Sequence, residues 1–154
     1  MRKYLLIAAV VFIIALTGCN HVETNVGKPP EVFVKIGDEN YRTELGTYCW
    51  SGNGIGECVD TAGSIELWAG KTPIKVKPGE EIKFVMDYEP KPNKSYVTQM
   101  FNGEKTEIVV DDHQFTAPTQ SGVYYYDYGV WWMDEKEANV SNGDAFYAFA
   151  IEVE

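Results

Sequence analysis

Apolar and polar residues alternate through most of the chain from residue 31 onward, in short stretches divided by glycine, proline and asparagine. The clearest stretch runs from Glu81 to Glu89, where Ile82 and Phe84 lie on one face of an extended chain and Lys83 lies on the other. A period of two is typical of a strand with one buried face. We identify no segment with the spacing of an amphipathic helix. The pattern therefore predicts a body made of strands.

The alternation and the turn residues between the stretches predict about eight to ten strands. We expect them at residues 32–36, 41–50, 64–68, 74–77, 81–89, 95–101, 104–110, 114–116, 122–133 and 145–153. Asn102-Gly103 joins two of these segments and supplies the pair of positive-φ residues that a type I′ hairpin turn requires. Strands at this spacing favour an all-β antiparallel sandwich or barrel over a fold of alternating strands and helices.

The first 18 residues have a different pattern, with basic Arg2-Lys3, an apolar run from Tyr4 to Leu16 and small residues after it. These are the three regions of an export signal. The apolar run is shorter than the about 20 residues that a helix needs to cross a bilayer. At its end, Leu16-Thr17-Gly18-Cys19 resembles the lipobox of bacterial lipoproteins.

The resemblance to lipoproteins implies that cleavage removes residues 1–18 as a signal peptide and that Cys19 becomes the lipidated first residue. A plain secretory signal and an uncleaved anchor are the alternatives. Residues 19–30 are polar and contain Gly27 and Pro29-Pro30, which predicts a tether, and residues 31–154 form one domain. Two or more acyl chains hold a protein in the lipid bilayer without spanning it. We therefore expect a lipid anchor on the extracytoplasmic face of the cell membrane and no cofactor besides the covalent lipid.

The chain has three cysteines. Lipid on Cys19 leaves Cys49 and Cys58 to pair with each other, as thiols of exported proteins do. Glycines in the segment between them predict a loop that folds tightly enough for a disulfide. A redox-active thiol pair and a metal site are the alternatives. Zinc would need further ligands, and no other Cys or His lies close to this segment in the sequence.

The chain carries 13 basic and 23 acidic residues, which gives a formal net charge of −10. Removal of Arg2 and Lys3 with the signal makes the mature protein more acidic still. This charge argues against nucleic acid as a partner and against electrostatic attraction to anionic lipid. It is compatible with a cationic partner, and equally with an acidic surface that serves solubility alone.

A second resemblance covers about residues 74–153. The segment from Pro118 to Tyr126 resembles the entry to strand F of immunoglobulin-like domains, where a tyrosine bonds back to the backbone at the corner. The resemblance implies that Tyr124 is this corner tyrosine and that Tyr126 takes the place of a cysteine of antibody domains. No cysteine lies near Phe84 or Met86 to complete the antibody disulfide. The body also resembles small extracytoplasmic lipoprotein or sensor domains of Gram-positive bacteria, so we expect an Ig-like β-sandwich.

Both faces of the segment 122–133 carry large rings, and the face that we expect in the core has Tyr124, Tyr126, Tyr128, Val130 and Trp132. Only one face of a sandwich strand belongs to the core, so a regular strand would leave Tyr125 and Trp131 outside with Asp127 between them. Exposed rings beside a carboxylate suit sugars or cationic side chains. We therefore predict a candidate ligand surface at Tyr125, Asp127 and Trp131, together with Trp50 beside the cysteine loop. The alternative is that a bulge or a neighbouring loop covers these rings.

Groups suited to catalysis are scarce in the sequence. Its histidines are His21 in the tether and His113 in a polar turn, and neither has a nucleophile or a set of metal ligands assembled around it in the sequence. We therefore predict a non-enzymatic binding or sensing module at the cell envelope, with a glycan, peptide or protein partner. The alternatives are a carbohydrate-binding accessory domain that uses the exposed rings and a thiol–disulfide protein that uses Cys49 and Cys58.

Overall fold

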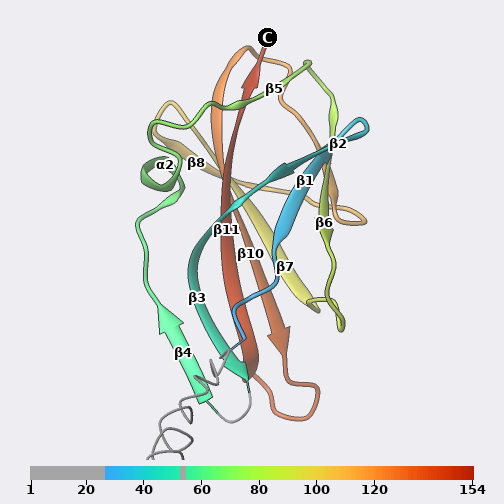
Figure 1. Ribbon diagram of the computed structural model, residues 1–154. Helices are drawn as coiled ribbons and strands as arrows, with labels where there is room; N and C mark the ends of the chain where they lie inside the picture. Colours follow the sequence, from blue (N-terminus) through green and yellow to red (C-terminus); the bar gives the residue numbers. More distant parts are fainter. Residues whose placement is uncertain (1–26, 53–54) are drawn as a thin grey trace, which may run out of the picture.

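The computed structural model describes residues 27–52 and 55–154. These residues form two sheets packed together, which confirms the predicted all-β sandwich (Figure 1). In chain order the elements are β1 (Val32–Ile36), β2 (Glu39–Arg42), β3 (Glu44–Gly52), β4 (Ile55–Val59), α2 (Ser64–Leu67), β5 (Ile74–Val76), β6 (Glu81–Met86), β7 (Lys94–Phe101), β8 (Glu104–Ile108), β9 (Gln114–Thr116), β10 (Gly122–Met133) and β11 (Ser141–Val153).

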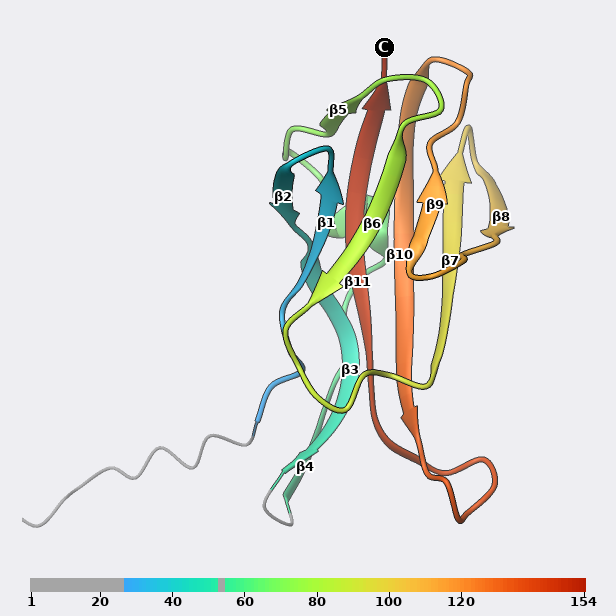
Figure 2. The same ribbon diagram turned by 90° about the vertical axis from the view of Figure 1, so that its right-hand side faces the viewer.

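The smaller sheet, sheet A, has the strand order β2-β1-β6-β9. The larger sheet, sheet B, has the order β4-β3-β11-β10-β7-β8, and β5 adds to β11. The pairings are antiparallel except that of β5 with β11, which is parallel. In Figure 2, β6 and β9 lie in front of β11 and β10, and the C-terminus lies at the opposite end from the tip of β3 and β4.

The strand pairing agrees with the expected immunoglobulin-like arrangement. If β6, β7, β9, β10 and β11 are given the letters B, C, E, F and G, sheet A joins B to E and sheet B joins C, F and G, as in immunoglobulin domains. Strands β1 and β2 then extend sheet A beside β6, and β3 and β4 extend sheet B beside β11. The N-terminal part of the domain thus widens both sheets.

The core between the sheets is rich in aromatic rings. The predicted inner face of β10 is confirmed, because its members are all buried: Tyr124, Tyr126, Tyr128, Val130 and Trp132. The Tyr126 hydroxyl donates to Gln99 Oε1 at 2.8 Å, which offsets the cost of burying its polar end. The Tyr126 ring stacks on Phe149 with centroids 4.8 Å apart. Burial of such large apolar areas is the main stabilising contribution to a core.

The hairpin between β7 and β8 has the turn that the sequence predicted. Asn102 has a φ of 51° and Gly103 a φ of 81°. Positive φ at both central residues is the requirement of a type I′ turn, whose twist matches that of the flanking strands. The prediction from Asn-Gly is therefore confirmed.

The segment from Ser64 to Trp68 is not the strand that we predicted. It begins with the one-turn helix α2, which packs on the outer face of sheet B against β3, β10 and β11. Ser64 and Trp68 are buried and lie four positions apart, whereas Ile65 and Glu66 between them are exposed. This is the spacing of a helical turn and not of a strand. So short a segment has too few residues to distinguish the period of a strand from the period of a helix.

The predicted strand 41–50 divides at Thr43. Its first part belongs to β2 in sheet A and its second part to β3 in sheet B. Thr43 is buried at the crossing, and both its amide and its hydroxyl donate to the carbonyl oxygen of Val32, at 3.2 and 2.7 Å. The chain therefore passes from one sheet to the other at a residue whose polar groups are satisfied.

The predicted signal peptide and lipobox, including Cys19, lie outside the described residues. Of the predicted tether, residues 27–30 are described, and they lie against the sandwich. Pro29 is buried, and the carbonyl oxygen of Pro30 accepts a hydrogen bond from the Tyr147 hydroxyl at 2.6 Å. The packed part of the chain thus begins a few residues before the expected domain boundary. No helix among the described residues is long and apolar enough to cross a membrane.

The corner tyrosine is confirmed. Tyr124 lies near the start of β10, is 2% exposed, and its hydroxyl donates to the carbonyl oxygen of Gln120 at 2.8 Å. The bond closes the turn that leads from β9 into β10, as in immunoglobulin-like domains.

We expect Tyr124→Phe to lower the free energy of unfolding by about 1 kcal/mol, because it removes this hydrogen bond and leaves the ring in place. Urea unfolding followed by tryptophan fluorescence measures the change. Tyr125→Phe is the matched control, since no hydrogen bond of the Tyr125 hydroxyl is found in the described structure, and its effect should stay within about 0.5 kcal/mol. Equal effects of the two substitutions would contradict the role of the corner bond.

Candidate functional site

A cleft is lined by residues from the ends of β3 and β10 and from neighbouring connections. In Figure 1, β3 and β10 end on the side of the sandwich opposite the C-terminus. Three rings line it: Trp50 from β3, Trp132 from β10 and Tyr88 from the connection between β6 and β7. The rings meet edge to face, with centroids 4.8 Å apart for Trp50 and Trp132, and 5.7 Å from each of these to Tyr88. This is a favoured arrangement of aromatic pairs. We call the site the aromatic cleft.

Trp50 can lie directly against β11 because position 143 is a glycine. The two residues pair across β3 and β11, and a Cβ atom at Gly143 would lie 2.7 Å from Cε3 of Trp50. Trp132 is fixed by its Nε1, which donates to the carbonyl oxygen of Pro90 at 2.6 Å. Each tryptophan exposes 7% of its surface, whereas Tyr88 exposes 36%. Tyr88 is therefore the ring that a ligand can reach most easily.

Polar groups surround the rings and connect the loops of the cleft. The Asn93 side chain donates to the carbonyl oxygen of Met133 at 2.9 Å and accepts from its amide at 2.8 Å. Asp134 accepts hydrogen bonds from the amides of Lys136 and Glu137, and these bonds lower the pKa of its carboxyl. The other polar side chains around the opening are those of Ser51, Lys91, Glu135, Lys136 and Asn142. Both signs of charge therefore border the cleft.

The aromatic cleft combines an aromatic surface with hydrogen-bonding groups. A sugar has an apolar face of C–H groups, which packs on an aromatic ring, and hydroxyls that bond to amides and carboxylates. The cleft encloses about 530 Å³, within the roughly 300–1,000 Å³ that is usual for ligand sites. Because lysines and carboxylates balance around the opening, the cleft favours a ligand without a strong net charge.

The structure separates the four residues of the predicted ligand surface. Trp50 lines the aromatic cleft, whereas Tyr125, Asp127 and Trp131 lie on the outer face of sheet B. All three outer residues are half-buried. Trp131 stacks on Tyr96 with centroids 5.2 Å apart. Neighbouring side chains thus cover part of these rings, and the four residues do not make one surface.

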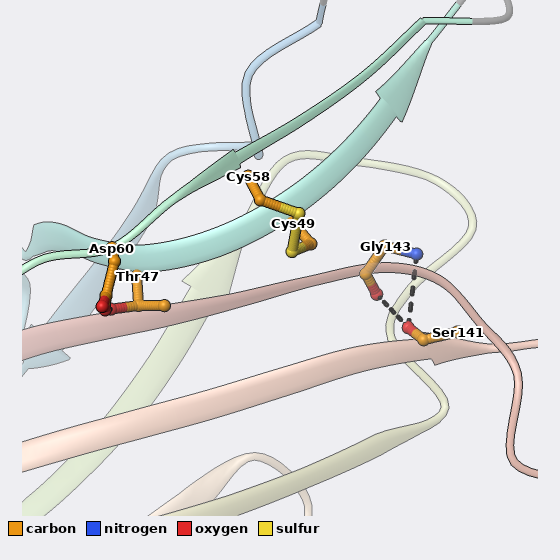
Figure 3. Close-up of a disulfide and its surroundings, with 6 residues drawn as sticks. All are labelled: Thr47, Cys49, Cys58, Asp60, Ser141 and Gly143. Carbon is orange, nitrogen blue, oxygen red and sulfur yellow. Dashed lines mark hydrogen bonds between the residues drawn. A yellow bond between two sulfur atoms is a disulfide. The ribbon is translucent and has the colours of Figure 1, made fainter.

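Cys49 and Cys58 form the predicted disulfide (Figure 3). They are directly opposite one another in β3 and β4, with Cα atoms 4.1 Å apart. Gly52 and Gly56 also belong to these strands. The segment between the cysteines is therefore largely a β-hairpin, and our prediction of a glycine-rich loop was wrong. Directly opposite residues of an antiparallel pair have their side chains on the same face of the sheet. The Cβ atoms of Cys49 and Cys58 therefore approach closely enough for a disulfide to join the two residues.

The disulfide lies on the outer face of the hairpin, where both cysteines are exposed. On the same face, Thr47 Oγ1 donates to Asp60 Oδ1 at 3.1 Å and accepts from the amide of Thr61 at 3.1 Å. Trp50 follows Cys49 directly and points to the inner face. The bridge thus holds β4 beside the strand that carries one wall of the aromatic cleft.

Within residues 27–52 and 55–154, no group of three His, Cys, Asp or Glu side chains is arranged to hold a metal ion. His113 is exposed in the turn before β9. His21 and Cys19 lie outside the described residues.

We did not select Tyr88 and Trp132 from the sequence, where both were expected to face the core. A signal was nevertheless present. Trp50, Tyr88 and Trp132 each stand at or near the end of a predicted strand. The strands β3, β6 and β10 all run toward the same end of the sandwich (Figure 2), so their last residues meet there.

No family model, no curated protein and no solved structure matches this chain. The case for a site therefore depends on the residues of the cleft and on their geometry.

We expect Gly143→Ala to displace Trp50 and to lower the free energy of unfolding by about 1 to 3 kcal/mol, the usual cost of overpacking. A shift of the tryptophan emission spectrum and urea unfolding would both report the change. Gly56→Ala is the matched control, because a Cβ atom there would meet Ser51 Oγ at an ordinary 3.6 Å. If Gly143→Ala behaves like this control, position 143 does not set the place of Trp50.

Proposed function

We propose that this protein is a membrane-anchored, extracytoplasmic binding module whose aromatic cleft takes a carbohydrate of the cell envelope. The observation that carries the proposal is the grouping of Trp50, Tyr88 and Trp132 beneath a polar rim. The Tyr88 ring, held against the two buried tryptophans, supplies the packing surface for a sugar, and the amides, lysines and carboxylates supply hydrogen bonds to its hydroxyls. The role is one of binding and not of catalysis.

The place where the chain joins the sandwich, at Gly27, supports the same proposal. A Cβ atom at Gly52 would lie 3.3 Å from the amide nitrogen of Gly27, so the first described residue lies at the end of the sandwich that carries the cleft. Cys19 precedes Gly27 by eight positions, which an extended chain spans in at most about 28 Å. A lipid on Cys19 would therefore keep the aromatic cleft close to the membrane surface, facing ligands that are held there.

A thiol–disulfide role has less support. Reactive cysteines usually lie at helix N-termini or beside basic groups, which stabilise the thiolate. Cys49 and Cys58 lie within paired strands, and Cys49 is opposite Asp144 on β11. An acidic neighbour disfavours a thiolate. The bridge therefore suits a structural role.

We expect Cys19→Ser to abolish attachment to the membrane, because no acyl chain can then be joined to residue 19. Cell fractionation measures the distribution, and intact-mass analysis of the native protein reports the acyl mass. The double variant Cys49→Ser/Cys58→Ser should keep that mass and stay in the membrane fraction. An unchanged membrane fraction in Cys19→Ser would refute the anchor while leaving the cleft untouched.

We expect soluble glycan fragments from digested cell wall to change the tryptophan emission of the purified protein, with an affinity that falls at least about tenfold in Tyr88→Ala. Tyr41→Ala, on the edge strand of sheet A, should bind like the parent protein. No spectral change with these glycans, or equal affinities of the two variants, would refute a carbohydrate site in the cleft.

A further inference from the structure

A second pocket lies on the outer face of sheet B and is independent of the aromatic cleft. It encloses about 270 Å³ between the strands and the segment that contains α2. Its walls include Leu67, Tyr96, Lys105, Asp127 and Phe146, and none of these residues lines the aromatic cleft. We call it the outer-face pocket.

Asp127 is one of the residues that line this pocket. It is half-buried, and among the described residues it takes part in no ion pair. The buried hydroxyl of Ser64 has no hydrogen-bond partner within ordinary distance, although it lies close enough to Asp127 to favour the charged carboxylate. Burial nevertheless raises the pKa of Asp127. Partial burial therefore disfavours the charged carboxylate, and a further ammonium group placed beside Asp127 would offset that cost.

Lys105 on β8 lines the same pocket with the opposite charge. Its ammonium group influences Asp127, lowering the pKa of that carboxyl, but the two side chains form no ion pair in the described structure. One cavity thus presents a carboxylate and an ammonium that are not joined to each other. A molecule with both an amine and a carboxylate would satisfy both.

The remaining walls of the pocket are mostly apolar or aromatic, and Thr47 and Thr61 add two hydroxyls. The rings of Tyr96 and Phe146 meet at 70° with centroids 6.2 Å apart. Leu67 of α2 and Ala148 of β11 also line the cavity. Ring faces attract an ammonium group, and the aliphatic groups suit an apolar side chain. The volume is below the roughly 300 Å³ at which pockets for drug-sized ligands begin, which favours a small molecule.

We propose that the outer-face pocket binds a free α-amino acid with an apolar side chain, its ammonium group at Asp127 and its carboxylate at Lys105. This goes beyond the proposed carbohydrate module, because it depends neither on the lipid anchor nor on the rings of the aromatic cleft. The protein would then bind two different ligands on opposite faces of β10.

The test uses the purified full-length protein and the proteinogenic L-amino acids as probes. Thermal unfolding with each of them at millimolar concentration should raise the unfolding midpoint for apolar amino acids, because a ligand that binds the folded state stabilises it. Calorimetry then gives the affinity of the strongest binder. Its primary amide, which lacks the carboxylate, and its deaminated acid, which lacks the amine, should each bind at least about tenfold more weakly.

Variants of the two charged residues locate the site. Asp127→Asn and Lys105→Met should each lower the affinity at least about tenfold, since each leaves one charge of the ligand unpaired. Asp144→Asn, on the same face but outside the pocket, and Lys35→Met, on sheet A, are the matched controls. The proposal is overturned if no amino acid shifts the midpoint, if both analogues bind like the parent compound, or if the pocket variants bind like the controls. Tyr88→Ala should bind amino acids normally, which separates this test from that of the carbohydrate site.

Discussion

The pairing of β10 with β11 extends along the whole length of β10, with one shift of register between Trp132 and Met133, and the other elements are arranged around it. The inner faces of these two strands contribute Tyr126 and Phe149, which stack on each other at the centre of the core. Sheet A packs onto these rings and their neighbour Tyr128, because Phe84 of β6 lies 5.9 Å from Phe149 and stacks on Tyr128 at a centroid distance of 3.8 Å. Because both sheets share these contacts, the stability of each sheet depends on the paired strands β10 and β11.

The same pairing places two different pockets on one strand. Successive residues of a strand point to opposite faces, so Trp132 reaches the aromatic cleft while Trp131 stacks on the outer face. Asp127 reaches the outer-face pocket in the same way. A slip of the register by one residue would exchange the two sets of side chains. The fixed pairing of β10 is therefore a condition for both sites.

Alternation was sufficient to predict most strands, because a strand with one buried face carries its period in the sequence. The limits of β10 follow directly from it, whereas the turn at Asn102-Gly103 follows from the preference of Asn-Gly for positive φ angles. The helix at Ser64 did not follow from the alternation, since one turn contains too few residues to show a period. We predicted a loop in place of the cysteine hairpin because glycine is frequent in turns. Here Gly52 and Gly56 belong to strands β3 and β4. The sites were harder to predict, because the meeting of Tyr88 with Trp50 is decided by how the strands are paired and not by local sequence.

The disulfide has a consequence for how the molecule behaves beside its neighbours. Strand β4 covers the edge of β3, and an uncovered edge is a template for pairing with another chain. If the hydrogen bonds of β4 open for a moment, the bond between Cys49 and Cys58 keeps the strand at a very high effective concentration beside β3. Re-pairing within the molecule is then favoured over exchange with a second copy. The disulfide therefore disfavours domain swapping at high local concentrations of the protein.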